Sequence, residues 1–154
     1  MFKERFSLAD LESDIVLVAR NLLPSDMIAM NRSRVRGIVM DAGGKTSHTA
    51  ILARAFEIPA VLGLGGAARA IRNGDILVVD GGSGDVFVEP DQATLDRFER
   101  SKLGMAERER HLRAIAALPA QTSDGKEVLI KANIEVPEET ESVLRHGASG
   151  IGLF

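Results

Sequence analysis

The chain has 154 residues, of which 45% are hydrophobic and 27% charged, and its formal net charge is −3. These proportions are ordinary for a globular protein, and the length suffices for one domain with a core plus an appendage. So small a net charge gives no electrostatic case for binding nucleic acid or an anionic membrane. There is no cysteine for disulfides or thiolate metal sites, and the sequence holds neither a signal peptide nor a membrane-spanning stretch, so we expect a cytoplasmic protein.

Strands and short helices alternate in the first half of the sequence. Residues 14–19 and 35–40 are apolar and rich in β-branched side chains, which is typical of buried strands. Between them, a proline followed by cap-forming side chains predicts a short helix with Ser25 or Asp26 as its N-cap. Residues 49–56 follow a helical pattern. The sequence therefore predicts a strand, a glycine-containing loop and a helix in direct succession.

The loop of residues 41–47 leads into His48 at the start of that helix. Free backbone N–H groups and the positive end of the helix dipole favour an anion there. An uncharged imidazole is a competent nucleophile toward phosphorus, and histidine titrates near neutrality. Glycines let the backbone approach a phosphoryl group, hydroxyls can donate hydrogen bonds to it and a lysine adds positive charge. The residues that supply these groups are Gly43, Gly44, Lys45, Thr46, Ser47 and Thr49.

Three other interpretations compete with a phosphate-carrying histidine. From its position alone, a histidine at a helix start is more often a cap or a packing residue than a catalyst. A Walker A loop fails on spacing, because Val39 stands where that motif needs a glycine. A serine nucleophile at Ser47 is disfavoured because adjacent side chains seldom face each other and the sequence has no nucleophile elbow.

Two glycine-rich turns follow the helix. Residues 63–68 match the pattern G-x-G-x-x-A, but the helix that would follow is cut short at residues 73–74. A structural turn is therefore favoured over a dinucleotide site. Residues 75–80 and 85–89 are apolar runs joined by glycines, which predicts a β-hairpin.

The sequence predicts no metal site. Asp75, Asp80 and Asp85 fall at strand ends and turns, where aspartate is common for local reasons, so a structural role is favoured for all three. His111 lies in a highly charged run without glycines or hydroxyls beside it, which indicates a solvated surface position.

The second half of the sequence has a different character. Residues 91–118 are highly charged and predict a solvated helix about 40 Å long, which indicates a connector or lever arm, with a possible kink at Gly104. Residues 127–133 predict a strand, residues 137–145 a helix opened by proline, and residues 148–154 another strand. Strand, helix and strand in this order are the beginning of a βα barrel.

Several segments carry a resemblance to a known family. Residues 43–54 and 57–63 resemble the phosphohistidine signature of enzyme I of the phosphoenolpyruvate:sugar phosphotransferase system. Similar signatures occur in phosphoenolpyruvate synthase and pyruvate phosphate dikinase, but a threonine after the histidine favours enzyme I. Residues 117–125, 132–137 and 147–154 also resemble enzyme I, in matching order, so the resemblance covers nearly the whole chain.

The resemblance implies an α/β fold in three parts. Residues 7–90 would form a phosphohistidine swivelling domain with β/β/α layers, residues 91–118 a helical linker, and residues 119–154 the truncated start of the phosphoenolpyruvate-binding (βα) barrel. In enzyme I, an initial strand and a helical domain that docks the phosphocarrier protein HPr come before this region, and the rest of the barrel follows it. The charged linker would let the domain swing between the donor and acceptor sites.

The resemblance also implies a function. His48 would take the phosphoryl group of phosphoenolpyruvate, releasing pyruvate, and pass it to a histidine of HPr in sugar transport, although this part of a transferase is not expected to turn over alone. Residues 43–47 and Thr49 would orient the phosphoryl group, and Arg54 could serve partner docking. Met27 stands where many members carry threonine, and its thioether cannot hydrogen-bond a resting histidine.

Further expectations concern cofactors and assembly. The parent enzyme would use Mg²⁺, bound by barrel residues outside this sequence, and would be a homodimer through the same barrel. No cofactor is expected on the residues present here. The alternatives are the phosphohistidine domain of a phosphoenolpyruvate synthase or pyruvate phosphate dikinase and, from another class, a non-catalytic interaction module.

Overall fold

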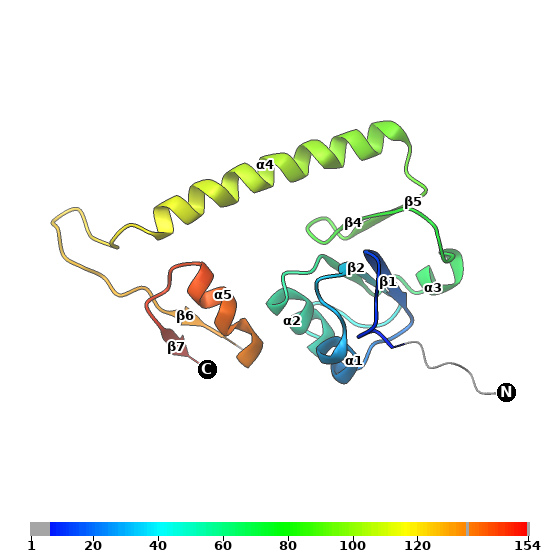
Figure 1. Cartoon of the computed structure of the whole chain (residues 1–154), viewed down its shortest axis with the longest axis horizontal. Helices are drawn as coiled ribbons and strands as arrows, with labels where there is room; N and C mark the ends of the chain where they lie inside the picture. Colours follow the sequence, from blue (N-terminus) through cyan, green and yellow to red (C-terminus); the bar gives the residue numbers. More distant parts are fainter. Residues whose placement is uncertain (1–6, 135, 154) are drawn as a thin grey trace. The chain divides into compact units, whose positions relative to one another are not determined.

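The structure is a computed structural model that describes residues 7–134 and 136–153. The chain divides into two units that meet in sequence between Pro90 and Asp91 (Figure 1). The first unit holds two small sheets and three helices, and the second holds one long helix and a small βαβ unit. The predicted α/β class and the long helix are confirmed. The boundary predicted between a linker and a barrel start inside the second unit stays a prediction.

A three-stranded parallel sheet forms the centre of the first unit. Its strands are β1 (Ile15–Ala19), β2 (Val35–Met40) and β3 (Ala60–Leu62), in that spatial order. The middle strand is covered on both faces, since Ile38, Val39 and Met40 are all buried. This explains why residues 35–40 form a nearly continuous apolar run rather than an alternating one.

Three short helices connect the strands of this unit: α1 (Pro24–Ala29), α2 (His48–Ala55) and α3 (Ala67–Ala70). Helices α1 and α2 contact each other beside the sheet (Figure 1). The N-cap predicted at Ser25 or Asp26 is wrong, because α1 already begins at Pro24 and its N-cap is Leu23. The Asp26 carboxylate instead accepts a hydrogen bond from the Leu23 N–H at 2.9 Å, which anchors the chain as it enters the helix.

The predicted hairpin is confirmed as β4 (Leu77–Asp80) and β5 (Asp85–Val88), an antiparallel pair. Strand β4 packs on β2 at Gly37, where an added Cβ would lie 3.4 Å from Val79. The Asp80 carboxylate accepts hydrogen bonds from two N–H groups of the hairpin turn, and the Asp75 carboxylate accepts one from the Arg72 N–H. These two aspartates therefore stabilise turns. The predicted β/β/α layering stays a prediction.

In the second unit, α4 (Gln92–Ala116) has 25 residues and continues unbroken through Gly104. A shorter βαβ unit follows, with β6 (Ala132–Asn133), the 3₁₀ helix η1 (Pro137–Glu139), α5 (Thr140–Arg145) and β7 (Ile151–Leu153). Strands β6 and β7 pair in parallel, so the predicted order of strand, helix and strand is present.

The first of these two strands is shorter than predicted. Residues 127–133 were expected to be a strand, but only Ala132 and Asn133 are. Leu129 and Ile130 are exposed, and Glu127 instead makes an isolated bridge to Gln121. An apolar run pairs as a strand only when a neighbouring strand lies beside it, and β7 reaches only the last two of these residues. Whether this unit begins a barrel stays a prediction.

Candidate functional site

Three loops meet at the carboxyl edge of the parallel sheet. The Ala42 N–H donates to the carbonyl of Arg20 at 3.0 Å, and the Leu64 N–H donates to the carbonyl of Met40 at 3.2 Å. The loop after β2 therefore lies between the loop after β1 and the loop after β3. This edge is where ligands bind in open α/β sheets, because loops and helix N-termini converge there.

The loop of residues 41–47 makes a sharp turn before α2. Gly43 has φ +99°, in the left-handed region that favours glycine. The Ser47 N–H donates to the carbonyl of Gly44 at 3.0 Å, and the Ser47 hydroxyl oxygen accepts a hydrogen bond from the Ala50 N–H at 3.2 Å. Ser47 is thus the N-cap of α2, and the helix begins at His48, one residue earlier than predicted.

His48 is exposed at the first position of α2. In the part of the chain that the structure describes, no side chain or carbonyl makes a hydrogen bond with its ring. The backbone N–H groups of His48 and Thr49 also find no acceptor among the described residues. The start of α2 therefore combines a reachable imidazole with unpaired N–H groups, which is the arrangement that favours an anion.

The residues before the cap leave room around this helix start. Lys45 and Thr46 are exposed, and a Cβ added at Gly44 would meet no atom within 4 Å. Because neither crowding nor a left-handed backbone requires glycine at position 44, its missing side chain leaves open space beside the helix start. The structure places Gly43, Gly44, Lys45, Thr46 and Ser47 in one loop next to His48.

Thr49 lies differently from the other predicted phosphate ligands. Its side chain is buried, with 6% of its surface exposed, and its hydroxyl donates to the carbonyl of Leu22 at 3.2 Å. That hydrogen bond joins the first turn of α2 to the loop after β1. The predicted phosphate contact of Thr49 stays a prediction. In this structure the Thr49 hydroxyl is engaged by the Leu22 carbonyl, and the Thr49 N–H has no acceptor among the described residues.

Two further residues singled out in the sequence lie outside the loop of residues 41–47. Arg54 is exposed in the last turn of α2, about 9 Å along the helix axis from His48. Met27 has no exposed surface and is a core residue of α1. A partner-docking role for Arg54 stays a prediction.

Asp41 is a residue of this edge that the sequence analysis did not predict. Its carboxylate accepts a hydrogen bond from the Ala68 N–H at 3.3 Å, and its carbonyl accepts one from the Gly65 N–H at 3.2 Å. Gly65 belongs to the turn that follows β3, and Ala68 belongs to α3. No periodic pattern relates residues so far apart in the chain, so only the shared sheet edge could have indicated this contact.

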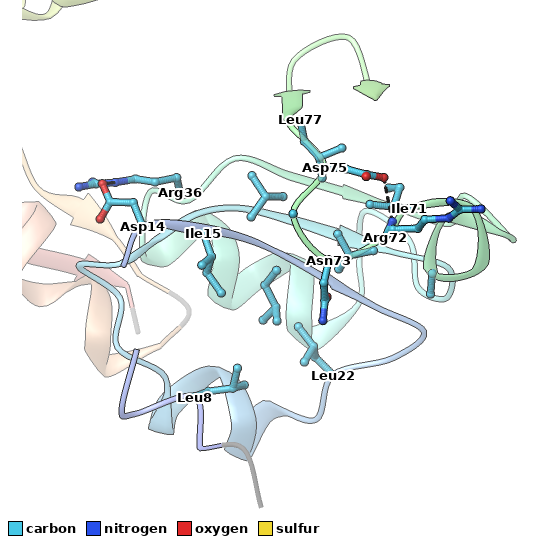
Figure 2. A pocket seen from close by; sticks show the side chains of 15 residues that line it. Leu8, Asp14, Ile15, Leu22, Arg36, Ile71, Arg72, Asn73, Asp75 and Leu77 are labelled. Carbon is cyan, nitrogen blue, oxygen red and sulfur yellow. Dashed lines mark hydrogen bonds and ion pairs between the residues drawn. The ribbon is translucent and has the colours of Figure 1, made fainter. Parts of the chain in front are cut away.

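A hollow of about 900 Å³ lies elsewhere in the first unit, along β1 and the segment of residues 71–75 (Figure 2). None of the residues from 41 to 49 lines it. Arg36 forms an ion pair with Asp14 at one end, and hydrogen bonds from Arg36 and Arg34 lower the pKa of the Asp14 carboxyl. The His48 site is therefore an open sheet edge and not this hollow.

Neither a metal-ion cluster nor a membrane-spanning helix occurs among residues 7–134 and 136–153. No group of three or more histidine, cysteine, aspartate and glutamate side chains there is placed to hold a metal ion. No described helix combines the length and apolar character needed to cross a membrane.

Two protein-family models match the chain. Residues 11–84 match the mobile domain of PEP-utilising enzymes, and residues 109–154 match the PEP-binding domain of PEP-utilising enzymes. The first match contains the whole loop and helix around His48. The second begins inside α4 and includes the βαβ unit.

Curated relatives and a solved structure agree with these matches. The chain is 37% identical over 144 residues to the phosphoenolpyruvate-protein phosphotransferase of Priestia megaterium, covering 94% of this chain and 25% of that protein. It is 35% identical to the Haemophilus influenzae protein of the same name, covering 96% and 26%. The solution structure of an Enzyme I protein is 44% identical and superposes with a TM-score of 0.61 over 66% of this chain and 41% of that one.

The resemblance to enzyme I seen in the sequence is thereby confirmed. The chain spans about a quarter of the length of the curated phosphotransferases it matches. The mobile-domain match precedes the PEP-binding-domain match, in the order that the resemblance implied, and the relatives named above share one name. This chain belongs to the PEP-utilising enzymes and is similar to the phosphoenolpyruvate-protein phosphotransferases.

Proposed function

We propose that this chain is the phosphocarrier part of a phosphoenolpyruvate-dependent protein phosphotransferase and that His48 carries the phosphoryl group. The observation that supports this most directly is the exposed His48 ring at the start of α2, beside N–H groups that have no acceptor among the described residues. A capping or packing histidine would be engaged by its neighbours, whereas this ring is left free for an incoming group.

The proposed reaction has two steps. A lone pair on one ring nitrogen of His48 attacks the phosphorus of phosphoenolpyruvate, so a P–N bond forms while the P–O bond to the enol breaks. The released enolate takes up a proton and becomes pyruvate. A histidine nitrogen of the acceptor protein then attacks the same phosphorus, the P–N bond to His48 breaks, and the His48 ring leaves with its electron pair.

The loop before α2 would hold the transferred group. The N–H groups of His48 and Thr49 and the hydroxyl of Thr46 are available donors, and the Lys45 ammonium adds positive charge. Gly44 leaves space for the phosphoryl oxygens. The Ser47 hydroxyl can donate its proton to the phosphoryl group while its oxygen keeps capping the helix.

The remaining parts of the proposal concern the whole enzyme. Phosphoenolpyruvate would bind to the barrel whose start matches residues 109–154, with Mg²⁺ held by residues outside this chain. No described residues here fit a Mg²⁺ site. HPr would be the acceptor, the compartment the cytoplasm, the pathway sugar transport and the parent a homodimer. Helix α4 would be the element about which the first unit swivels between donor and acceptor.

Labelling of the chain tests the proposal. The 154-residue chain is incubated with phosphoenolpyruvate, Mg²⁺ and a separately supplied phosphoenolpyruvate-binding barrel domain, and an acid-labile phosphoryl adduct is sought. We expect labelling of the wild-type chain, its complete loss in His48→Ala, and no change in His111→Ala, which removes an exposed histidine of α4. Absence of an adduct, or labelling that survives in His48→Ala, would refute the carrier role and favour a non-catalytic module.

A synthase or dikinase of the same family shares this chemistry. A nucleotide-binding domain in the complete protein would indicate a synthase or dikinase. Transfer of the phosphoryl group from the labelled chain to HPr would instead indicate the phosphotransferase. The phosphotransferase names of the relatives favour the first reading.

A further inference from the structure

We propose that the turn of residues 63–66, together with Asp41, is a positioning element that holds the loop carrying His48. This inference rests on the proposed carrier function of His48. It gives a role to the glycine pattern of residues 63–68, which does not form a dinucleotide site.

The backbone contact between two glycines is the first support. Gly63 has φ +85°, and a Cβ there would lie 3.1 Å from the carbonyl oxygen of Gly43. On the other side, a Cβ added at Gly43 would lie 3.0 Å from Leu62. The turn after β3 therefore lies close against the loop before α2, and a side chain at Gly63 would require the backbone of Gly43 to shift by a few tenths of an ångström.

Two hydrogen bonds tie the same turn to the end of β2, and a third joins α3 to Asp41. The N–H groups of Leu64 and Gly65 donate to the carbonyls of Met40 and Asp41, each at 3.2 Å. The Ala68 N–H donates to the Asp41 carboxylate at 3.3 Å. The turn is thus attached to the chain immediately before Gly43.

The attachment continues from Gly43 to the histidine. The next residue, Gly44, accepts the hydrogen bond of the Ser47 N–H, and Ser47 caps the helix that begins with His48. A displacement of Gly43 would therefore shift Ser47 and the direction in which the His48 ring and the first N–H groups of α2 point. Small misplacements of a reacting group cost large factors in rate, because the reaction needs a near-attack geometry.

Gly84 offers a matched control for Gly63. It has the same φ of +85°, in the turn between β4 and β5, but a Cβ added there would meet no atom within 4 Å. The variants Gly63→Ala and Gly84→Ala therefore place alanine at the same positive φ, and only the first brings its Cβ against the His48 loop. Asp41→Ala and Asp41→Asn form a second pair, because asparagine keeps an oxygen that can accept from Ala68.

The experiment compares three measurements on the 154-residue chain and these variants. They are the thermal unfolding midpoint, the amide NMR signals of residues 43–49, and the initial rate of labelling from phosphoenolpyruvate with the supplied barrel. For Gly63→Ala we expect shifted or broadened signals of Gly44, Ser47 and His48 and a rate at least tenfold lower, whereas Gly84→Ala leaves both unchanged at a similar unfolding midpoint. Asp41→Ala should lower the rate, and Asp41→Asn should restore most of it.

Each outcome decides the inference. If Gly63→Ala labels as fast as Gly84→Ala, or if its signals change only within residues 62–66, the turn is a structural element alone and the proposal is wrong. If the wild-type chain is not labelled at all, the carrier function fails, and unchanged signals of residues 43–49 in Gly63→Ala would separately show that the turn does not position the loop.

Discussion

The starts of α2 and α4 are capped alike, but their cap side chains differ in charge. In each helix the residue before the first turn caps it, with Ser47 accepting from the Ala50 N–H at 3.2 Å and Asp91 accepting from the Thr94 N–H at 2.8 Å. The Ser47 hydroxyl is neutral, whereas Asp91 brings a carboxylate whose pKa is lowered by its hydrogen bonds with Thr94. The positive end of α4 is therefore neutralised by its own cap, and that of α2 remains available to an anion.

The charge of the cap side chain distinguishes the two helix starts. Asp91 stabilises α4 and neutralises its positive end, whereas Ser47 stabilises α2 and leaves its positive end open to an anion. Both side chains satisfy the same backbone donor, so helix stability does not require the choice of serine at α2. What serine leaves at α2 is a positive helix end beside an exposed His48. The identity of the cap is thus informative about function where the geometry alone is not.

Exchanging the caps is expected to have the largest effect. Ser47→Asp keeps a competent N-cap but places a negative charge where the phosphoryl group must approach. Two like charges about 4 Å apart near a protein surface repel by about 1–4 kcal/mol. We therefore expect the initial rate of His48 labelling to fall by about 10- to 100-fold, measured with phosphoenolpyruvate and the supplied barrel domain.

The reverse exchange is its control. Asp91→Ser changes the cap of α4 in the same chemical way, and the labelling rate of His48 should stay at the wild-type value. Circular dichroism should show unchanged helix content in Ser47→Asp. Labelling of Ser47→Asp at the wild-type rate would mean that the charge of the α2 cap does not govern phosphoryl transfer.

The sequence predicted the framework of this site because local chemistry determines it. Residues 35–40 are apolar enough to be only a buried strand, and the helical pattern of residues 49–56 marks the start of α2 within one residue. The hairpin of residues 75–89 followed from glycines between two apolar runs. These features depend on neighbours in the chain.

What the sequence could not supply were contacts between distant segments. The burial of the Thr49 hydroxyl against Leu22 depends on the loop after β1, and the role of Asp41 depends on the turn after β3 and on α3. Likewise, the strand predicted at residues 127–133 assumed a partner along its whole length, and β7 pairs with its last two residues only. Tertiary pairing decided each of these cases.

The hydrogen bond from the Thr49 hydroxyl to the Leu22 carbonyl provides a second comparison between the first turns of α2 and α4. In Thr49→Val the buried carbonyl of Leu22 loses its donor, which costs about 1–3 kcal/mol of unfolding free energy. Urea unfolding followed at the amide signals of Leu52 and Ala53 measures the loss. Thr49→Ser, which keeps the hydroxyl, should be less destabilised than Thr49→Val.

Thr94→Val is the matched substitution in α4. Thr94 is not buried, and its N–H remains bonded to Asp91, so we expect a smaller loss than at Thr49. Equal losses in the two valine variants would mean that the first turn of α2 is no more firmly anchored than that of α4.

The smallest expected effect is a difference in acid sensitivity between the two helix starts. The Thr94 hydroxyl and N–H hold the pKa of Asp91 below its ordinary value of 3.8 in the folded chain. A carboxyl with a lowered folded pKa stabilises the fold above its unfolded pKa, and this contribution is lost as the pH falls from about 4 through the folded pKa. Because a serine hydroxyl does not titrate there, the Ala50 amide of α2 should stay protected over a range in which the Thr94 amide of α4 loses protection.

Hydrogen exchange at these two amides between about pH 5 and pH 2, corrected for the intrinsic pH dependence of exchange, measures the difference. In Asp91→Ser the acid-induced loss at Thr94 should disappear, and in Ser47→Asp a new loss should appear at Ala50. If Ala50 in the wild-type chain loses protection together with Thr94, the two helix starts respond to a common unfolding event and not to the charge of their caps. If the acid-induced loss instead disappears in Asp91→Ser and appears in Ser47→Asp, the charge of the cap is the property that distinguishes α2 from α4.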